Sequence, residues 1–163
     1  MVKDKRKKDA PTATETPSNP NSTTDNCNTL YRKSQVDRDQ RTRNFATVVY
    51  PESAPSDWID KLDQLHVAAL ISPLHDKDTN PSGEPKKPHY HVLLMFEGKK
   101  DYEKQVKPIF AEIGGVGREI VNSARGYARY LCHLDNPEKA QYEPSEVRCM
   151  GGADYTDITN LPT

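Results

Sequence analysis

The chain has 163 residues, of which 34% are hydrophobic and 29% are charged, and its mean hydropathy is −0.90. This composition is too polar for one fully packed globule of that length, so we expect part of the chain to be unstructured. No stretch approaches the roughly 18 apolar residues of a transmembrane helix, and the charged residues 1–9 precede no apolar segment. We therefore expect a cytoplasmic protein that neither enters a membrane nor is secreted.

The first 43 residues differ in composition from the rest of the chain. They contain ten Lys or Arg and six Asp or Glu, whereas the remainder contains 13 and 18, respectively. Between positions 2 and 29, Val2 is the single large aliphatic residue, and there is no aromatic residue. Such a segment cannot bury enough apolar surface to offset its conformational entropy. We predict a disordered, polar and basic tail over residues 1–43 and one folded domain over residues 44–163.

The folded part alternates strand and helix patterns. Strands are expected where β-branched, aromatic or continuous apolar residues run between turn formers, at residues 45–50, 67–72, 89–96, 119–122 and 146–150. Helices are expected where apolar residues recur every three or four positions, at residues 57–66, 101–113 and 123–134. Ser56 and Ser123 are predicted N-caps, and Pro108 predicts a kink or a late start of its helix. The pattern predicts an α+β fold, with helices packed on a mostly antiparallel central sheet of about five strands.

The sharpest local motif is KPHYHVLLMF, which carries His89 and His91 in the third predicted strand. Residues two apart in a strand face the same side, so both imidazoles project from one face while Tyr90 takes the other. Two ring nitrogens a few ångströms apart suit a divalent metal ion. The spacing also arises by chance, but in a strand it predicts half of a metal site.

The end of the preceding predicted strand supplies two more candidate ligands, His75 and Asp78. If the loop of residues 76–87 joins adjacent antiparallel strands, the end of the first lies beside the start of the second. Imidazoles and one carboxylate, with positions open to water or phosphate, fit a catalytic Mn²⁺ or Mg²⁺ ion better than a closed structural site. The alternative for either residue alone is that His75 merely ends its strand and Asp78 is a solvated loop charge.

Two tyrosines share a face of the third predicted helix. Tyr127 and Tyr130 repeat at helical spacing with Leu131 and Leu134, a pattern that ordinary core packing also explains. A tyrosine hydroxyl that overhangs a metal site can attack a phosphodiester, because Tyr is among the side chains that form covalent intermediates. This helix is therefore a candidate source of a nucleophile.

Four blocks of the chain resemble a known family in order and spacing: YPESAPSDW at 50–58, ISPLHDKD at 71–78, KPHYHV at 87–92 and YLCH at 130–133. They are similar to rolling-circle replication initiators of small plasmids from Gram-positive bacteria, of the streptococcal and lactic-acid-bacterial type. These initiators belong to the HUH endonuclease superfamily, named after its His-hydrophobe-His strand motif. The likeness spans roughly residues 45–155.

The resemblance implies a ferredoxin-like domain that binds the origin and nicks one strand. In such a domain Tyr130 matches the catalytic nucleophile, with Tyr127 as the alternative. Attack leaves a 5′-phosphotyrosine and a free 3′-OH that primes synthesis, and the same site can rejoin DNA. The implied partners are single-stranded or hairpin origin DNA of a plasmid and the host replication machinery. The implied ligands of Mn²⁺ or Mg²⁺ are His75, Asp78, His89 and His91.

The charge of the folded part disfavours DNA binding, since residues 44–163 have a formal net charge of −5 and nucleic-acid-binding domains are usually basic. Local basic side chains beside the predicted site offset this deficit. The expected DNA contacts are Lys86, Lys87, Arg125 and Arg129. A second group of lysines, at residues 99–107, is equally well explained as a solvated helix face.

Two other functions fit parts of the pattern. A mobilisation relaxase shares the chemistry, but most relaxase families carry the nucleophilic Tyr before the His motif, and residues 1–30 contain no Tyr. A non-catalytic origin-binding module would use its metal structurally. Cleavage of an origin hairpin in the presence of Mn²⁺ separates the enzyme from the binding module.

Overall fold

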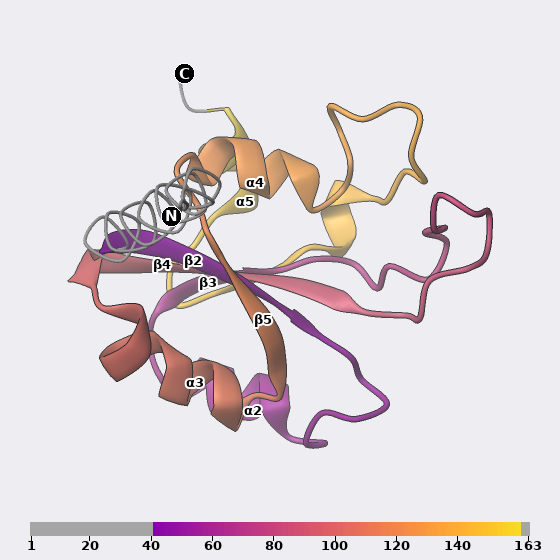
Figure 1. The fold of residues 1–163 in the computed structure, drawn as a ribbon. Coiled ribbons are helices and arrows are strands. Elements are labelled where there is room, and N and C mark those ends of the chain that lie inside the picture. The colour runs from indigo at the N-terminus through magenta and orange to yellow at the C-terminus, as the bar shows by residue number, and fades with distance from the viewer. Residues whose placement is uncertain (1–40, 161–163) are drawn as a thin grey trace, which may run out of the picture. The chain divides into compact units, whose positions relative to one another are not determined.

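A computed structural model describes residues 41–160, so the predicted tail lies almost entirely outside the described residues. Within this range the chain forms a five-stranded antiparallel sheet with the strand order β5-β2-β4-β3-β6 (Figure 1). In chain order the strands are β2 (Thr42–Val49), β3 (Ala68–Ile71), β4 (Tyr90–Lys100), β5 (Gly115–Ile120) and β6 (Arg148–Met150). The predicted α+β fold with a mostly antiparallel sheet is confirmed.

Helices cover both faces of the sheet (Figure 1). On one face lie α2 (Trp58–Asp63) and α3 (Lys107–Glu112), and on the other lie α4 (Ala124–Tyr130) and α5 (Tyr155–Thr159). A π-helical turn (Tyr102–Val106) leads into α3, and a 3₁₀ turn (Pro144–Glu146) precedes β6. Among residues 41–160 there is no helix with the length and apolar character needed to cross a membrane.

The central strand β4 contributes alternate side chains to two separate cores. Val92 and Leu94 pack with Trp58 on the α2 face, whereas Leu93 packs against α4 on the opposite face. Full burial of each leucine contributes about 2 kcal/mol to the free energy of unfolding. Because a slip of one residue would move these side chains to the wrong faces, the register of the strand is strongly specified. His91 has the same parity as Leu93 and therefore faces α4. A slip of one residue would turn His91 away from this face.

Of three predictions about helix starts, one is wrong and two are confirmed. The N-cap assigned to Ser56 is wrong, because α2 begins at Trp58 after Asp57, whose side chain makes no capping bond. Ser123 is confirmed as a cap, since its hydroxyl accepts the Gly126 N–H at 3.0 Å. The late start expected from Pro108 is also confirmed, because this residue lies in the first turn of α3.

Two features of the C-terminal half of the domain differ from the prediction, namely the start of β5 and the presence of α5. β5 begins at Gly115 rather than at residue 119, and its register with β2 shifts between Ala46 and Val48. Gly117 adopts a φ of 72°, and its carbonyl accepts the Thr47 hydroxyl at 2.7 Å, so the shift is held by a glycine backbone and a cross-strand hydrogen bond. The short helix α5 was not predicted, because five residues carry too little periodicity to reveal a helix.

Candidate metal and nucleophile site

The site forms where the chain leaves β3 and enters β4. Beyond β3 the two segments stay paired, since the Ser72 hydroxyl accepts the His91 N–H at 2.9 Å, and His75 and His89 exchange backbone hydrogen bonds. Pro73 has no N–H and interrupts the regular ladder between these pairs. The end of the first strand therefore lies beside the start of the second, as expected for adjacent antiparallel strands.

Four side chains converge on the α4 face of the sheet. Each offers one ligand atom, and these atoms all lie within 4.8 Å of one another; the residues are His75, Asp78, His89 and His91. The Asp78 Oδ2 atom lies 3.0 Å from His75 Nδ1 and 3.6 Å from His89 Nε2. The three histidines are buried, and the Asp78 side chain is 10% exposed. The structure thus brings together all four sequence-predicted metal ligands.

Backbone hydrogen bonds orient two of the imidazole rings. Because a carbonyl oxygen only accepts, His75 Nε2–H donates to the Leu131 carbonyl at 2.7 Å, and His89 Nδ1–H donates to the Lys87 carbonyl at 2.8 Å. The opposite nitrogens, His75 Nδ1 and His89 Nε2, are the two that face Asp78. Hydrogen bonds of this kind fix the tautomer and the ring plane of metal-binding histidines.

Burial governs the protonation of the cluster. It lowers the pKa of His91 to about 3, with further contributions from His75 and His89, and it also lowers the pKa of His75. Burial acts to raise the pKa of Asp78, but the hydrogen bond that the Tyr142 hydroxyl donates is the largest of the contributions that bring this pKa below its usual value. At neutral pH these lowered pKa values keep His75 and His91 neutral and Asp78 ionised, which are the forms that bind metal ions.

The donor set fits a divalent metal ion. Mixed imidazole nitrogens and a carboxylate oxygen are ligands for first-row divalent ions. Ligand atoms bound at about 2.1–2.2 Å lie at most about 4.4 Å apart, so separations within 4.8 Å require only small side-chain adjustments. The cluster is therefore compact enough to hold a divalent metal ion.

The helix α4 brings both candidate nucleophiles to the cluster. Tyr127 is buried, its hydroxyl lies 3.4 Å from His91 Nδ1, and burial raises the pKa of Tyr127. Tyr130 is half-buried, and its ring centroid lies 5.5 Å from that of His91. Tyr127 is thus packed as a hydrogen-bond partner of a histidine, whereas Tyr130 is accessible from solvent.

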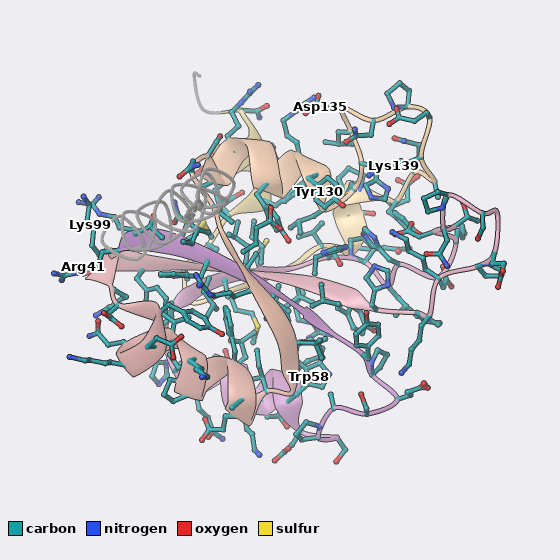
Figure 2. The ribbon with its side chains drawn as sticks, viewed as in Figure 1. Arg41, Trp58, Lys99, Tyr130, Asp135 and Lys139 are labelled. Carbon is teal, nitrogen blue, oxygen red and sulfur yellow. The ribbon has the colours of Figure 1, made fainter. Side chains whose placement is uncertain are left out.

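Tyr130 lies between two cavities. One, of about 120 Å³, also touches Lys77, Asp78, Lys86, His133 and Lys139. The other, of about 560 Å³, extends across the sheet past Val48, His91, Glu119 and Tyr127. Figure 2 shows Tyr130 and Lys139 on the α4 side of the sheet and Trp58 on the opposite side. A ligand can therefore reach the tyrosine and the His/Asp cluster from the same face.

Two residues of the site were not predicted. His133 is buried at a φ of 57°, its Nδ1–H donates to the Ala140 carbonyl at 2.7 Å, and its ring lies 4.9 Å from that of His75. The Tyr142 hydroxyl donates to Asp78 Oδ1 at 2.7 Å. Both residues lie in the irregular segment after α4, where no periodic pattern marks them. The YLCH block was the only sequence signal for His133, and none indicated Tyr142.

The four basic residues expected to contact DNA have different surroundings. Lys86 lines the smaller cavity, and Lys87 forms an ion pair of 3.1 Å with a surface glutamate. Arg125 donates to a backbone carbonyl of α5 at 2.9 Å. Arg129 donates two hydrogen bonds, of 2.8 and 2.7 Å, to the Asp135 carboxylate. Both arginines are therefore engaged within the domain, whereas Lys86 lies beside Tyr130.

Comparisons with known proteins identify relatives of the chain. Residues 37–156 match the family model described as the plasmid replication protein, origin-binding domain. The chain is 39% identical over 134 residues to a replication protein of Staphylococcus aureus, a match that covers 82% of this chain and 67% of the relative. It is 44% identical over 124 residues to replication protein RepB of Lactiplantibacillus plantarum, covering 76% and 56% of the two chains.

A third relative is replication protein RepB of Streptococcus agalactiae. It is 32% identical over 131 residues, and the match covers 75% of this chain and 62% of the relative. The alignments therefore span between 56% and 67% of the length of these three relatives.

Proposed function

Because the chain belongs to the family of plasmid replication proteins with an origin-binding domain, we propose that it initiates rolling-circle replication by nicking one strand of the plasmid origin. The observation that carries this proposal is the position of an accessible tyrosine, Tyr130, on the helix above a buried cluster of three histidines and an aspartate. This pairing of a potential nucleophile with a potential metal site is the arrangement that phosphodiester transesterification needs.

Tyr130 is the proposed nucleophile. Its phenolic oxygen forms a bond to the scissile phosphorus as the bond from phosphorus to the 3′ oxygen of the preceding nucleotide breaks. The phenolic proton is released, and the departing oxygen takes up a proton, which leaves a 5′-phosphotyrosine and a free 3′-OH that can prime synthesis. One phosphoester replaces another, so the reverse reaction rejoins a strand at the same site.

A divalent ion, Mn²⁺ or Mg²⁺, is the proposed cofactor, held by His75, Asp78, His89 and His91. When bound it supplies Lewis-acid polarisation of a non-bridging phosphate oxygen. The protein contributes two imidazole rings oriented by backbone carbonyls, His75 and His89, and an Asp78 carboxylate that stays ionised. These groups are in position before substrate arrives, which lowers the cost of ordering them during the reaction.

The accessibility of Tyr130 favours it over Tyr127. A nucleophile has to reach the phosphorus in line with the departing oxygen, and Tyr130 borders both cavities. Tyr127 is 8% exposed, and its hydroxyl is directed to His91. For Tyr127 to attack, it would have to leave this contact and its packed position under α4.

Single-stranded DNA exposed in an origin hairpin is the proposed substrate. The scissile phosphate has to lie against the sheet and α4 at once, and a phosphate inside a regular duplex would not fit both. Lys77, Lys86 and Lys139 line the smaller cavity beside Tyr130 and supply local positive charge for the neighbouring phosphates. The host replication machinery is then proposed to extend the free 3′-OH.

Single-turnover cleavage tests the proposal. The full chain is incubated with a labelled hairpin oligonucleotide from the origin, with Mn²⁺ or with EDTA, and the products are separated under denaturing conditions. We expect a covalent protein–DNA adduct and a shortened strand with a free 3′-OH in Mn²⁺ alone. Binding of the hairpin without any cleavage would instead identify a non-catalytic origin-binding module.

A further inference from the structure

Tyr142 contacts two members of the metal cluster, Asp78 and His75. It lies 12 residues beyond Tyr130, between the end of α4 and the 3₁₀ turn, and is 8% exposed. Its backbone N–H donates to the Cys132 carbonyl at 3.4 Å, which ties it to the segment that ends α4. The residue is therefore buried between the nucleophile helix and the loop that carries Asp78.

The direction of the hydrogen bonds at the Tyr142 hydroxyl is determined by its neighbours. The Lys77 backbone N–H donates to the phenolic oxygen at 3.0 Å. The hydroxyl proton is then available for Asp78 Oδ1, which accepts it at 2.7 Å. Because Oδ1 is engaged in this way, Oδ2 is the oxygen that faces His75 and His89.

The same ring also contacts a second proposed ligand. The Tyr142 and His75 rings are stacked, with centroids 4.2 Å apart and planes inclined by 11°. The hydrogen bond to the Leu131 carbonyl holds the Nε2 edge of the His75 ring. The imidazole could still rotate out of its plane about this bond, and the stacking on Tyr142 restrains that rotation. One tyrosine therefore restrains both the carboxylate and an imidazole that face each other at 3.0 Å.

We propose that Tyr142 is a positioning residue for the metal site, which selects the coordinating oxygen of Asp78 and sets the plane of His75. This inference rests on the proposed metal-dependent function. Groups that orient metal ligands typically change metal affinity by about 10- to 100-fold when removed. Since Tyr142 is joined to the end of α4, it also links the geometry of the ligands to the helix that carries Tyr130.

Metal binding by the full chain carrying Tyr142→Phe tests this role without relying on cleavage. The substitution keeps the ring and removes the proton donated to Asp78. We expect isothermal titration calorimetry to show Mn²⁺ affinity reduced by about tenfold or more. The unfolding temperature in EDTA reports whether the variant is folded, and the electron paramagnetic resonance spectrum of bound Mn²⁺ reports the coordination itself.

Tyr155→Phe is the matched control. Tyr155 is buried to a similar extent, 7% exposed, on the same side of the sheet, and its hydroxyl has no hydrogen-bond partner among residues 41–160. We expect this variant to bind Mn²⁺ within about twofold of the unmodified chain, because its hydroxyl does not contact a ligand.

Three outcomes separate this inference from the proposed function. Reduced affinity in Tyr142→Phe alone supports the positioning role. Unchanged affinity and an unchanged spectrum in Tyr142→Phe, with normal Mn²⁺ binding by the unmodified chain, overturn the role and leave the metal site standing. Failure of the unmodified chain to bind Mn²⁺ overturns both. If Tyr142→Phe does not fold, Tyr142→Leu, which also removes the donated proton and adds no metal ligand, takes its place under the same criteria.

Discussion

Replacing Tyr130 by Phe is expected to abolish covalent attachment to DNA while leaving the domain folded. The substitution removes the hydroxyl of a half-buried tyrosine, which makes no hydrogen bond within residues 41–160, and keeps the ring that packs beside His91 and His133. The free energy of unfolding should therefore change by less than about 0.5 kcal/mol. Binding of Mn²⁺ should also be preserved, because Tyr130 is not among the ligand residues.

The catalytic effect should be far larger than the effect on stability. Without the phenolic oxygen no phosphotyrosine can form, so the single-turnover rate should fall by at least about 1,000-fold, which corresponds to about 4 kcal/mol of activation free energy. The assay follows a labelled origin hairpin in Mn²⁺ on a denaturing gel. Mass spectrometry of the peptide that carries the oligonucleotide then identifies the attached residue.

Tyr127→Phe is the control one helical turn away. It removes a hydroxyl 3.4 Å from His91 Nδ1, so it should cost about 1 kcal/mol of stability and weaken Mn²⁺ binding by up to about tenfold. At saturating Mn²⁺ the adduct should still form. An adduct that maps to Tyr127, or one that persists in Tyr130→Phe, would refute the assignment of Tyr130.

Three further predictions concern the ligands, the tail and pH. His89→Ala or His91→Ala should lower Mn²⁺ affinity by about 100-fold or more and abolish cleavage, and calorimetry that shows unchanged Mn²⁺ binding in both variants would remove them from the metal site. Deletion of residues 1–40 should leave the cleavage rate of a short oligonucleotide unchanged, because every proposed site residue lies beyond residue 40. A decrease of the cleavage rate by more than about tenfold at moderate salt would show instead that this segment contacts DNA. The metal-free domain should lose stability on acidification, because unfolded His91 titrates near 6.5 whereas burial holds its folded pKa at about 3. Between these two pKa values the unfolded state binds more protons than the folded state, so the free energy of unfolding should fall by up to about 1.4 kcal/mol for each pH unit of acidification. Urea denaturation in EDTA measures this dependence. A free energy of unfolding that does not change with pH below about pH 6.5 would contradict the buried, neutral state of His91.

The strand that carries His89 and His91 was predictable because its information is local. A run of apolar residues after KPH specifies a buried strand, and alternation along a strand requires side chains two apart to share a face. The antiparallel pairing that brings His75 and Asp78 to the histidine pair was expected only on the condition that the intervening loop, which holds several turn-forming residues, joins adjacent strands. The face of the strand follows from its period, whereas the pairing was established by the structure.

Element boundaries were predicted less well than element types. The N-cap at Ser56 failed because the sequence offers several polar residues before Trp58, and the backbone path alone decides which of them precedes the first helical turn. The early start of β5 depends on Gly117, whose positive φ accommodates a register shift against β2 that no local pattern encodes.

The chemical roles within the site depended on tertiary structure. Tyr127 and Tyr130 are equivalent by sequence spacing, and only the packing of α4 on the sheet buries one hydroxyl against His91 and leaves the other open to two cavities. Tyr142 has no signal in the sequence, because its contact with Asp78 spans 64 residues.

The sequence by itself determined the fold class, the histidine face of β4 and the helix that carries the tyrosines, since each follows from periodicity within one segment. The tertiary structure decided which tyrosine is accessible, which oxygen of Asp78 faces the histidines and which residues orient the rings. These properties arise where segments far apart in the chain meet, and burial and hydrogen-bond direction exist only after the segments have packed.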